Sequence, residues 1–438
     1  MRIAPLLLTL LLTTPALAQA PRTVTYEQAL RLAAGRAPSV IAARARARAV
    51  AAQEDVARAG YLPSLTLGAN GNLGFAQIPQ RVGAMGADVV SFSFLSLAGD
   101  SALNGRLNLY DFGRTANAVR AAELGSEASR QDARAALRQS LLGASVAYFT
   151  ALADREVLSN IRATVAQREA HLRIAQGLVG AGTRPPIEAL RAELNLEAAR
   201  LDLTVAEANA RGDLAGLAAA LGLEPTELLE VVPVEDPPAE DDDPIDAAER
   251  ALRERPELSA ARIRAVQAEV QAETARAGRL PTLSATASAS LRYTTVLNGQ
   301  GTPGPTTQIS GGLAFTWPLF DPTVRANVVS ADANAVAARA SAEQVSLTVR
   351  AEATQAAIAV QAARSARDQS LRLAAAAAAN LEQAAGRYAQ GATGLLELVD
   401  AQAADASARI SVVRARVNLL LARARMEAAT GALEARAR

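Results

Sequence analysis

The chain has 438 residues, with 45 Lys and Arg against 44 Asp and Glu, so its formal net charge is +1. A nucleic-acid partner would need a basic surface, and this balance argues against one. The sequence contains no cysteine, which excludes a disulfide framework, a thiolate metal site and a cysteine nucleophile. It also lacks the residue on which a bacterial lipoprotein anchor is built, and no cofactor is expected.

Residues 1–18 are expected to be a secretory signal peptide. Arg2 supplies the positive start, a leucine-rich stretch forms the apolar core, and the small residues Ala16 and Ala18 flank a cleavage site before Gln19. No later window offers about twenty uninterrupted apolar residues. Any role of the mature chain in a membrane would therefore have to come from strands.

The helical segments are long and come in pairs. Residues 24–59 predict two helices broken near Pro38, the first starting with a capping box of Thr25 and Gln28. The proline-free stretch from Arg114 to Arg184 predicts one helix of about 65 residues. After a break at residues 177–186, apolar residues recur at spacings of three and four, as in a coiled-coil seam: Ile187, Leu190, Leu194, Ala198, Leu201 and Val205. The same layout returns after residue 322, with Ile410, Val413, Val417 and Leu420 in a second seam.

Two stretches alternate with a period of two. In residues 282–294 the odd-numbered positions are apolar and the even-numbered ones are Ser, Thr or Arg, and residues 308–317 repeat the pattern more loosely. Strands of about ten residues with one apolar and one polar face are what a transmembrane barrel needs. A half-buried hairpin in a soluble sandwich has the same alternation, and the pattern alone leaves both interpretations open.

The chain is internally duplicated. Residues 57–65 (Ala-Arg-Ala-Gly-Tyr-Leu-Pro-Ser-Leu) return as residues 275–283, and the turn Leu-Tyr-Asp-Phe-Gly at 109–113 is echoed at 319–322. We therefore divide the mature chain into a first repeat at 19–222, an acidic proline-rich linker at 223–245, and a second repeat at 246–438. Each repeat is predicted to carry a β-hairpin, at about 63–110 and 281–319, followed by long coiled helices.

These motifs resemble the TolC-like outer-membrane efflux proteins, the outer membrane factors. The resemblance rests on the duplicated Ala-Arg-Ala-Gly-x-Leu-Pro-x-Leu, the turn at 109–113, and two helix-hairpin tips at 182–190 and 388–401. It implies a mainly α-helical fold with a β-barrel part. Each chain of a homotrimer would give four strands to a twelve-stranded transmembrane barrel, and long antiparallel helical hairpins would form an α-helical barrel in the periplasm of a Gram-negative bacterium.

The resemblance also implies site residues at the tips and at the membrane boundary. Tyr388 matches a tyrosine that in this family helps to latch the closed tip. The arginine expected at position 393 is Thr393, so the latch is expected to be weaker or to use different contacts. An ordinary solvated helix face remains the alternative for Glu397 and Asp400. The tip turns fall on Gly182 and Gly391. The expected residues of the pore constriction are Glu397, Asp400, Tyr388, Glu188 and Arg184, and those of an aromatic belt are Tyr110, Phe112, Phe315, Trp317 and Phe320.

The function implied is an exit duct of a tripartite efflux or type I secretion system. Its partners would be a periplasmic adaptor, an inner-membrane transporter of the RND, ABC or MFS type, and outer-membrane lipid. The alternative is a periplasmic coiled-coil protein, structural or adhesive, that forms no channel. An enzyme is not expected, because His171 is the only histidine, is predicted to be solvated, and no phosphate-binding loop is present. The sequence does not identify the exported substrate or the pump.

Overall fold

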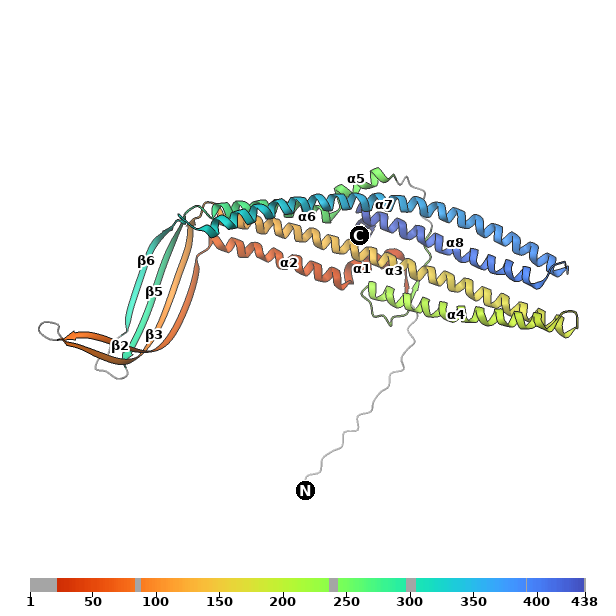
Figure 1. Ribbon diagram of the computed structural model, residues 1–438, viewed down its shortest axis with the longest axis horizontal. Coiled ribbons are helices and arrows are strands. Elements are labelled where there is room, and N and C mark those ends of the chain that lie inside the picture. Colours follow the sequence, from red (N-terminus) through yellow and green to blue (C-terminus); the bar gives the residue numbers. More distant parts are fainter. Residues whose placement is uncertain (1–21, 83–87, 236–242, 297–304, 391, 437–438) are drawn as a thin grey trace, which may run out of the picture. The chain divides into compact units, whose positions relative to one another are not determined.

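The computed structural model describes residues 22–82, 88–235, 243–296, 305–390 and 392–436 (Figure 1). The predicted signal peptide and residues 236–242 of the linker lie outside this range. The chain forms two compact units, and each takes residues from both predicted repeats. The strand unit comprises Ala43–Arg134 and Pro256–Thr348, and the remaining residues form the helical unit.

The strand unit contains a four-stranded antiparallel sheet, as predicted. Its strands pair in the order β2-β3-β5-β6 (Figure 1). Their bounds are β2 (Ser64–Val82), β3 (Asp88–Tyr110), β5 (Thr282–Val296) and β6 (Thr306–Thr316). The two hairpins are joined by pairing of β3 with β5, in a register that places Leu103 opposite Ala289.

This register collects the apolar side chains on one face of the sheet. Leu67 lies opposite Leu103, and Ala289 lies opposite Ile309, so odd-numbered positions share a face across all four strands. Leu67 is 78% exposed and Ile309 82% exposed. A half-buried sheet in a soluble sandwich would need this face covered, and within the described chain it is open.

The duplicated motifs meet where the sheet joins the helices of the strand unit. A bulge between Asn108 and Tyr110 moves Tyr110 opposite Leu283 on the apolar face. Asp111 then caps the next helix by accepting a hydrogen bond of 2.9 Å from the amide of Thr115. Arg114 donates hydrogen bonds to the carbonyl oxygens of Ala277, Gly278 and Leu280, and so ties the turn after β3 to the second copy of the Ala-Arg-Ala-Gly motif.

The helices confirm the predicted pairs. The capping box of Thr25 and Gln28 is present. None of the helices in the described part of the chain is both long and apolar enough to cross a membrane. The helices are α1 (Tyr26–Arg36), α2 (Pro38–Arg58), α3 (Arg114–Gly180), α4 (Pro186–Ala220), α5 (Pro244–Glu254), α6 (Pro256–Ala277), α7 (Pro322–Ala389), α8 (Leu395–Thr430) and α9 (Leu433–Arg436), with a short 3-10 turn η1 (Ala59–Tyr61).

The two predicted coiled-coil seams have opposite environments. On α8, Val413, Val417 and Leu420 are buried within the chain. On α4, the buried residues that pack toward α3 are instead Leu196 and Ala199. The predicted α4 seam is left open, with these residues between 49% and 67% exposed: Ile187, Leu190, Leu194, Leu201 and Val205. We call these five residues the α4 stripe.

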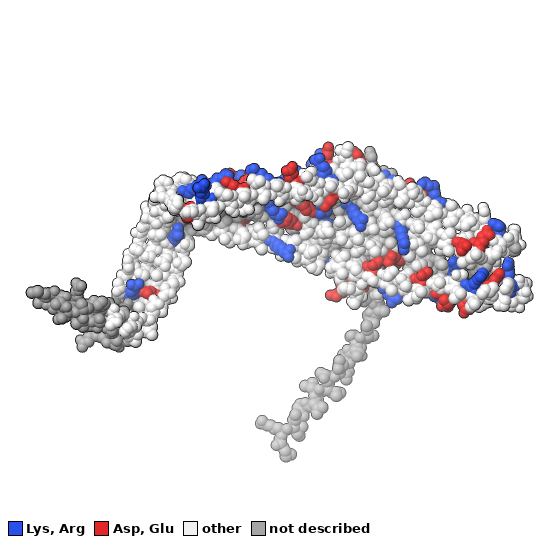
Figure 2. Space-filling view, in the orientation of Figure 1, with Lys and Arg blue, Asp and Glu red and all other residues white. Residues whose placement is uncertain are grey.

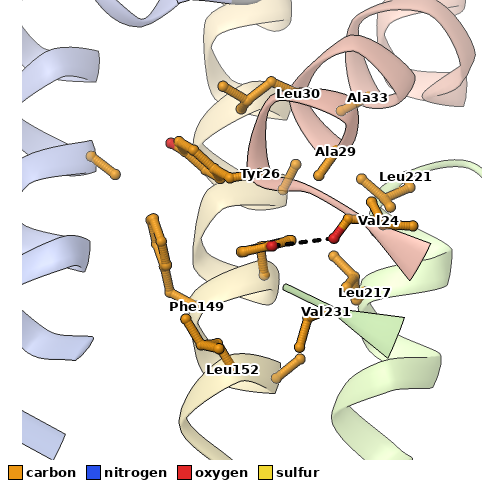
Figure 3. Packing of buried hydrophobic residues seen from close by; sticks show 14 of the residues in the cluster. Val24, Tyr26, Ala29, Leu30, Ala33, Phe149, Leu152, Leu217, Leu221 and Val231 are labelled. Atoms are coloured by element: carbon orange, nitrogen blue, oxygen red, sulfur yellow. Dashed lines mark hydrogen bonds between the residues drawn. The ribbon is translucent and has the colours of Figure 1, made fainter. Parts of the chain in front are cut away.

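The core of the helical unit is organised by a small sheet that the sequence did not reveal (Figure 3). Strand β1 (Arg22–Val24) pairs in parallel with β4 (Leu229–Val231), which lies inside the segment predicted as a linker. The hydroxyl of Tyr148 donates to the carbonyl oxygens of Val24 (3.2 Å) and Val232 (2.7 Å), so α3 holds both strands. Leucines and alanines of α1, α3 and α4 pack around this sheet.

Candidate functional site

The tips of the two helix hairpins of the helical unit share one backbone hydrogen bond at equivalent positions. At the first tip, Gly182 adopts a left-handed φ of 73°, and the amide of Thr183 donates to the carbonyl of Leu178 at 3.1 Å, which closes the end of α3 as a Schellman motif. At the second tip, the amide of Ala392 donates to the carbonyl of Arg387 at 2.9 Å. Gly391 lies outside the described residues.

The two tips contact each other through Arg184 and Tyr388. The guanidinium carbon of Arg184 lies 5.3 Å from the centre of the Tyr388 ring, a cation–π geometry. The same guanidinium pairs with Glu188, with 3.5 Å between Nη1 and Oε1. Burial raises the pKa of the Tyr388 hydroxyl, and the negative charge of Glu188 raises it further. The tyrosine therefore stays neutral and links α7 to the first hairpin.

His171 lies near Tyr388 and is half-buried. The ring centres of His171 and Tyr388 are 6.3 Å apart. The Nε2 atom of His171 is buried and has no hydrogen-bond partner among the described atoms. Burial lowers the pKa of His171 and the positive charge of Arg168 lowers it further, so the imidazole is neutral at pH 7. The prediction of a solvated His171 is wrong, because the Tyr388 ring of α7 lies near the imidazole and its Nε2 atom is buried.

A cavity of about 710 Å³ lies between the two hairpins next to these residues. Across it, Nη1 of Arg168 on α3 donates a 2.5 Å hydrogen bond to Oε1 of Gln402 on α8. Burial lowers the pKa of Arg168. The cavity is lined by apolar and amide side chains from both hairpins, among them Gln167, Ile174, Leu178, Gln390, Leu398 and Gln402.

Glu397 occupies the position in the second tip that Glu188 occupies in the first, but its environment differs. The side chain of Glu188 is 13% exposed and that of Glu397 is 46% exposed. Glu397 pairs with Arg387 at 2.8 Å and accepts a hydrogen bond from the hydroxyl of Thr393. Thr393 thus contacts the carboxylate from the position that Arg184 holds in the first tip, and Arg387 supplies the positive charge.

Asp400 lies one turn beyond Glu397 on α8 and is exposed. The spacing of three residues puts both carboxylates on one face of the helix. The sequence pattern identified these two acids, but it gave no signal for the partners Arg387, Arg168 and Gln402. Their roles depend on how the hairpins are packed, not on a motif.

The five aromatic residues predicted to form a belt lie where the strands meet the helices in the strand unit. All five are exposed. Tyr110 and Phe112 stack edge to face with ring centres 4.7 Å apart, and the indole nitrogen of Trp317 donates to the carbonyl of Arg279 at 3.2 Å. Exposed aromatic rings with one polar contact are typical of a membrane–water interface.

Long helical hairpins and an amphipathic four-stranded sheet are the fold of solved outer-membrane channels. The chain is similar to the outer-membrane channel OprN, with 24% identity, a TM-score of 0.76 and coverage of 93% of this chain and 89% of that one. It is also similar to the CmeC outer membrane channel of Campylobacter jejuni, with 19% identity, a TM-score of 0.78 and coverage of 93% and 85%. Both likenesses concern the fold alone.

Sequence comparison identifies the family. A family model described as outer membrane efflux protein matches residues 29–223 and 247–432. The chain belongs to this family, and the resemblance read from the motifs is confirmed. Protein CyaE of Bordetella pertussis is 29% identical over 387 residues, which cover 87% of this chain and 78% of CyaE.

Membership in this family identifies the class of protein to which the chain belongs. Its proteins are channels of the Gram-negative outer membrane, not enzymes. They are homotrimers that work with an adaptor and an inner-membrane pump. These features agree with the predictions made from the duplicated motifs.

Proposed function

We propose that this chain is the exit duct of a tripartite efflux or type I secretion system and passively conducts substrates across the periplasm and the outer membrane. The single observation that supports this best is the sheet, whose exposed apolar face suits lipid and whose other face is polar. A sheet with these two faces can line a water-filled lumen in a membrane.

Assembly from three copies follows from the edges of this sheet. Strands β2 and β6 are its outer strands, and each is paired on one side only. An unpaired strand edge in lipid would leave backbone amides and carbonyls without partners. Four strands are too few to close a barrel, for which about eight are needed, whereas three copies would supply twelve.

The α4 stripe supports the same assembly in the helical unit. Its five residues recur at coiled-coil spacing and are exposed in the single chain. We propose that the stripe packs against a helix of a neighbouring copy, which would close a helical barrel. The five exposed aromatic residues would then form the belt at the periplasmic boundary of the membrane.

The hairpin tips are the proposed gate. Arg184 and Tyr388 would latch the two hairpins of each copy, while Glu397 and Asp400 of three copies would place acidic rings at the constriction. The adaptor is proposed to dock near residues 170–195 and 380–405.

The test combines membrane extraction, mass and conductance. A duct should leave the membrane only with detergent, run as a trimer, and give small ion-conducting steps in a planar lipid bilayer. A soluble monomer or a non-conducting coiled-coil assembly would instead support the alternative of a structural or adhesive protein.

A further inference from the structure

A single arginine stands out on the polar face of the sheet. Arg106 lies on β3 and is exposed. Arg106 is paired with Ser64 on β2 and with Thr286 on β5, and Thr286 is paired in turn with Gly312 on β6. We call such a row of paired residues across the sheet a level. These three neighbours are small and uncharged, so the long guanidinium side chain rises above the surface around it.

The levels on either side of Arg106 are also neutral. Asn104 and Ser288 lie on one side, and Asn108 and Ser284 lie on the other. Within the described part of the sheet, the Arg106 side chain has no ion pair or hydrogen bond. The charge of Arg106 is therefore not balanced by a neighbour on its own face.

The other described charges of this face cancel each other. Arg292 on β5 lies directly opposite Asp100 on β3, and its Nε donates to the carboxylate at 2.6 Å. Asp100 is six residues from Arg106 and Asp111, just after β3, is five residues from it, which is about 20 Å and about 16 Å along a strand. Because the Debye length is about 8 Å at physiological salt, neither carboxylate neutralises Arg106 at that distance. Few charged side chains are visible on the described part of the sheet (Figure 2).

We propose that Arg106 forms a cationic collar inside the barrel that favours anions. This inference rests on the proposed function, in which three copies close one barrel with the polar face inward. Three guanidinium groups at one level would then face the lumen with no carboxylate near them. Each guanidinium offers donors in a planar fork that matches carboxylate and phosphate groups. The substrate class that the collar suits is therefore organic anions with carboxylate or phosphate groups.

The collar and the acidic tip differ in the charge that they present. At the tip, part of the acidic charge is balanced by Arg387. At the collar, Arg106 is the only charged side chain among the described residues paired across the four strands at that position.

The first test measures ion preference in planar bilayers under a potassium chloride gradient. Arg106→Gln should lower the chloride-to-potassium permeability ratio of the trimer roughly two- to fivefold at low salt, and Arg106→Lys should keep it. The matched control, Asp100→Asn with Arg292→Gln, removes a balanced pair from the same face and should leave the ratio unchanged. A conducting wild type whose ratio does not respond to Arg106→Gln would overturn the collar and leave the duct intact.

The second test uses the absence of cysteine in the wild-type chain. Arg106→Cys should react with a water-soluble, anionic thiosulfonate reagent in the membrane-embedded trimer, and the reaction should reduce the current. Leu103→Cys, on the apolar face of the same strand, should not react. Reaction at position 103 but not at 106, or a wild type that is no conducting trimer, would overturn the barrel itself and with it the collar.

Discussion

The guanidinium of Arg184 lies over the ring of Tyr388, 5.3 Å from its centre, and joins the tip of one helix hairpin to the end of the other. Arg184 comes from the turn between α3 and α4, whereas Tyr388 comes from the last turn of α7. The contact also brings Glu188 and His171 around the same tyrosine. It links the two tips of the helical unit.

Removing this contact should loosen the proposed latch between the two hairpins. A partly exposed cation–π pair contributes about 0.5–1 kcal/mol, which corresponds to roughly a two- to fivefold change in the open fraction. Arg184→Ala and Tyr388→Ala should therefore raise single-channel conductance or open probability. Arg191→Ala removes an exposed arginine of α4 outside the Arg184–Tyr388 pair, serves as the control and should behave as wild type. Equal conductance in all three variants would show that the pair is no latch.

The acidic residues of the second tip should set its ion preference. Glu397→Ala combined with Asp400→Ala should reduce the preference for potassium over chloride, because two negative charges per copy are removed. Arg387→Gln should have the opposite effect, since it leaves the Glu397 carboxylate without its cation. Reversal potentials of the three proteins measure both effects, and unchanged values in the double variant would contradict an acidic constriction.

The α4 stripe should be required for assembly. Replacing Leu194 and Leu201 with glutamate puts charges on a surface that the proposed neighbour must cover, so the trimer should dissociate at a lower temperature. Glu193→Gln, on the same helix but outside the stripe, is the control. Native mass and thermal dissociation in detergent provide the readout. A doubly substituted trimer as heat-resistant as wild type would place the contact between copies elsewhere.

A carboxylate pair between α3 and α4 should make stability depend on pH. Burial, and then the hydrogen bond and charge of Asp213, raise the pKa of Asp154 to about 6. Because the folded chain holds this proton more tightly than the unfolded chain, stability should fall as pH rises from about 4 through 6. Asp154→Asn should remove this loss and stabilise the protein at pH 7.5 by on the order of 1 kcal/mol, after allowance for partial exposure. Melting temperatures at pH 5 and 7.5 test this, with Asp202→Asn as the control.

His171 should produce the opposite dependence at slightly higher pH. Burial and Arg168 hold the pKa of His171 below its ordinary value of 6.5. The unfolded chain then takes up the proton first, so stability should fall as pH drops below about 6.5. His171→Gln, which stays neutral, should lose this part of the pH dependence. If the slope between pH 7 and 5.5 is the same in both proteins, the ring is not held neutral by its surroundings.

Local sequence patterns alone determined much of the secondary structure of this protein. Alternation of polar and apolar residues predicted both hairpins, because a period of two is a property of the strand itself. The capping box at Thr25, the breaks at glycine and proline, and the duplicated motifs located the helices and led to the correct family. The proposal that Glu397 and Asp400 are tip acids came from the family resemblance of the tip motif, and their role stays a prediction.

Packing between distant segments decided the rest. The apolar residues of α4 and α8 have the same spacing, but those of α4 form an exposed stripe and those of α8 a buried seam. Spacing determines which residues share a helix face, but not what covers that face. The equivalent acids Glu188 and Glu397 differ in burial for the same reason. Strand β4 was not predicted from the sequence, because it is stabilised by pairing with β1, more than 200 residues away in the chain. The hydrogen bonds of a parallel pair cannot be formed by either strand alone.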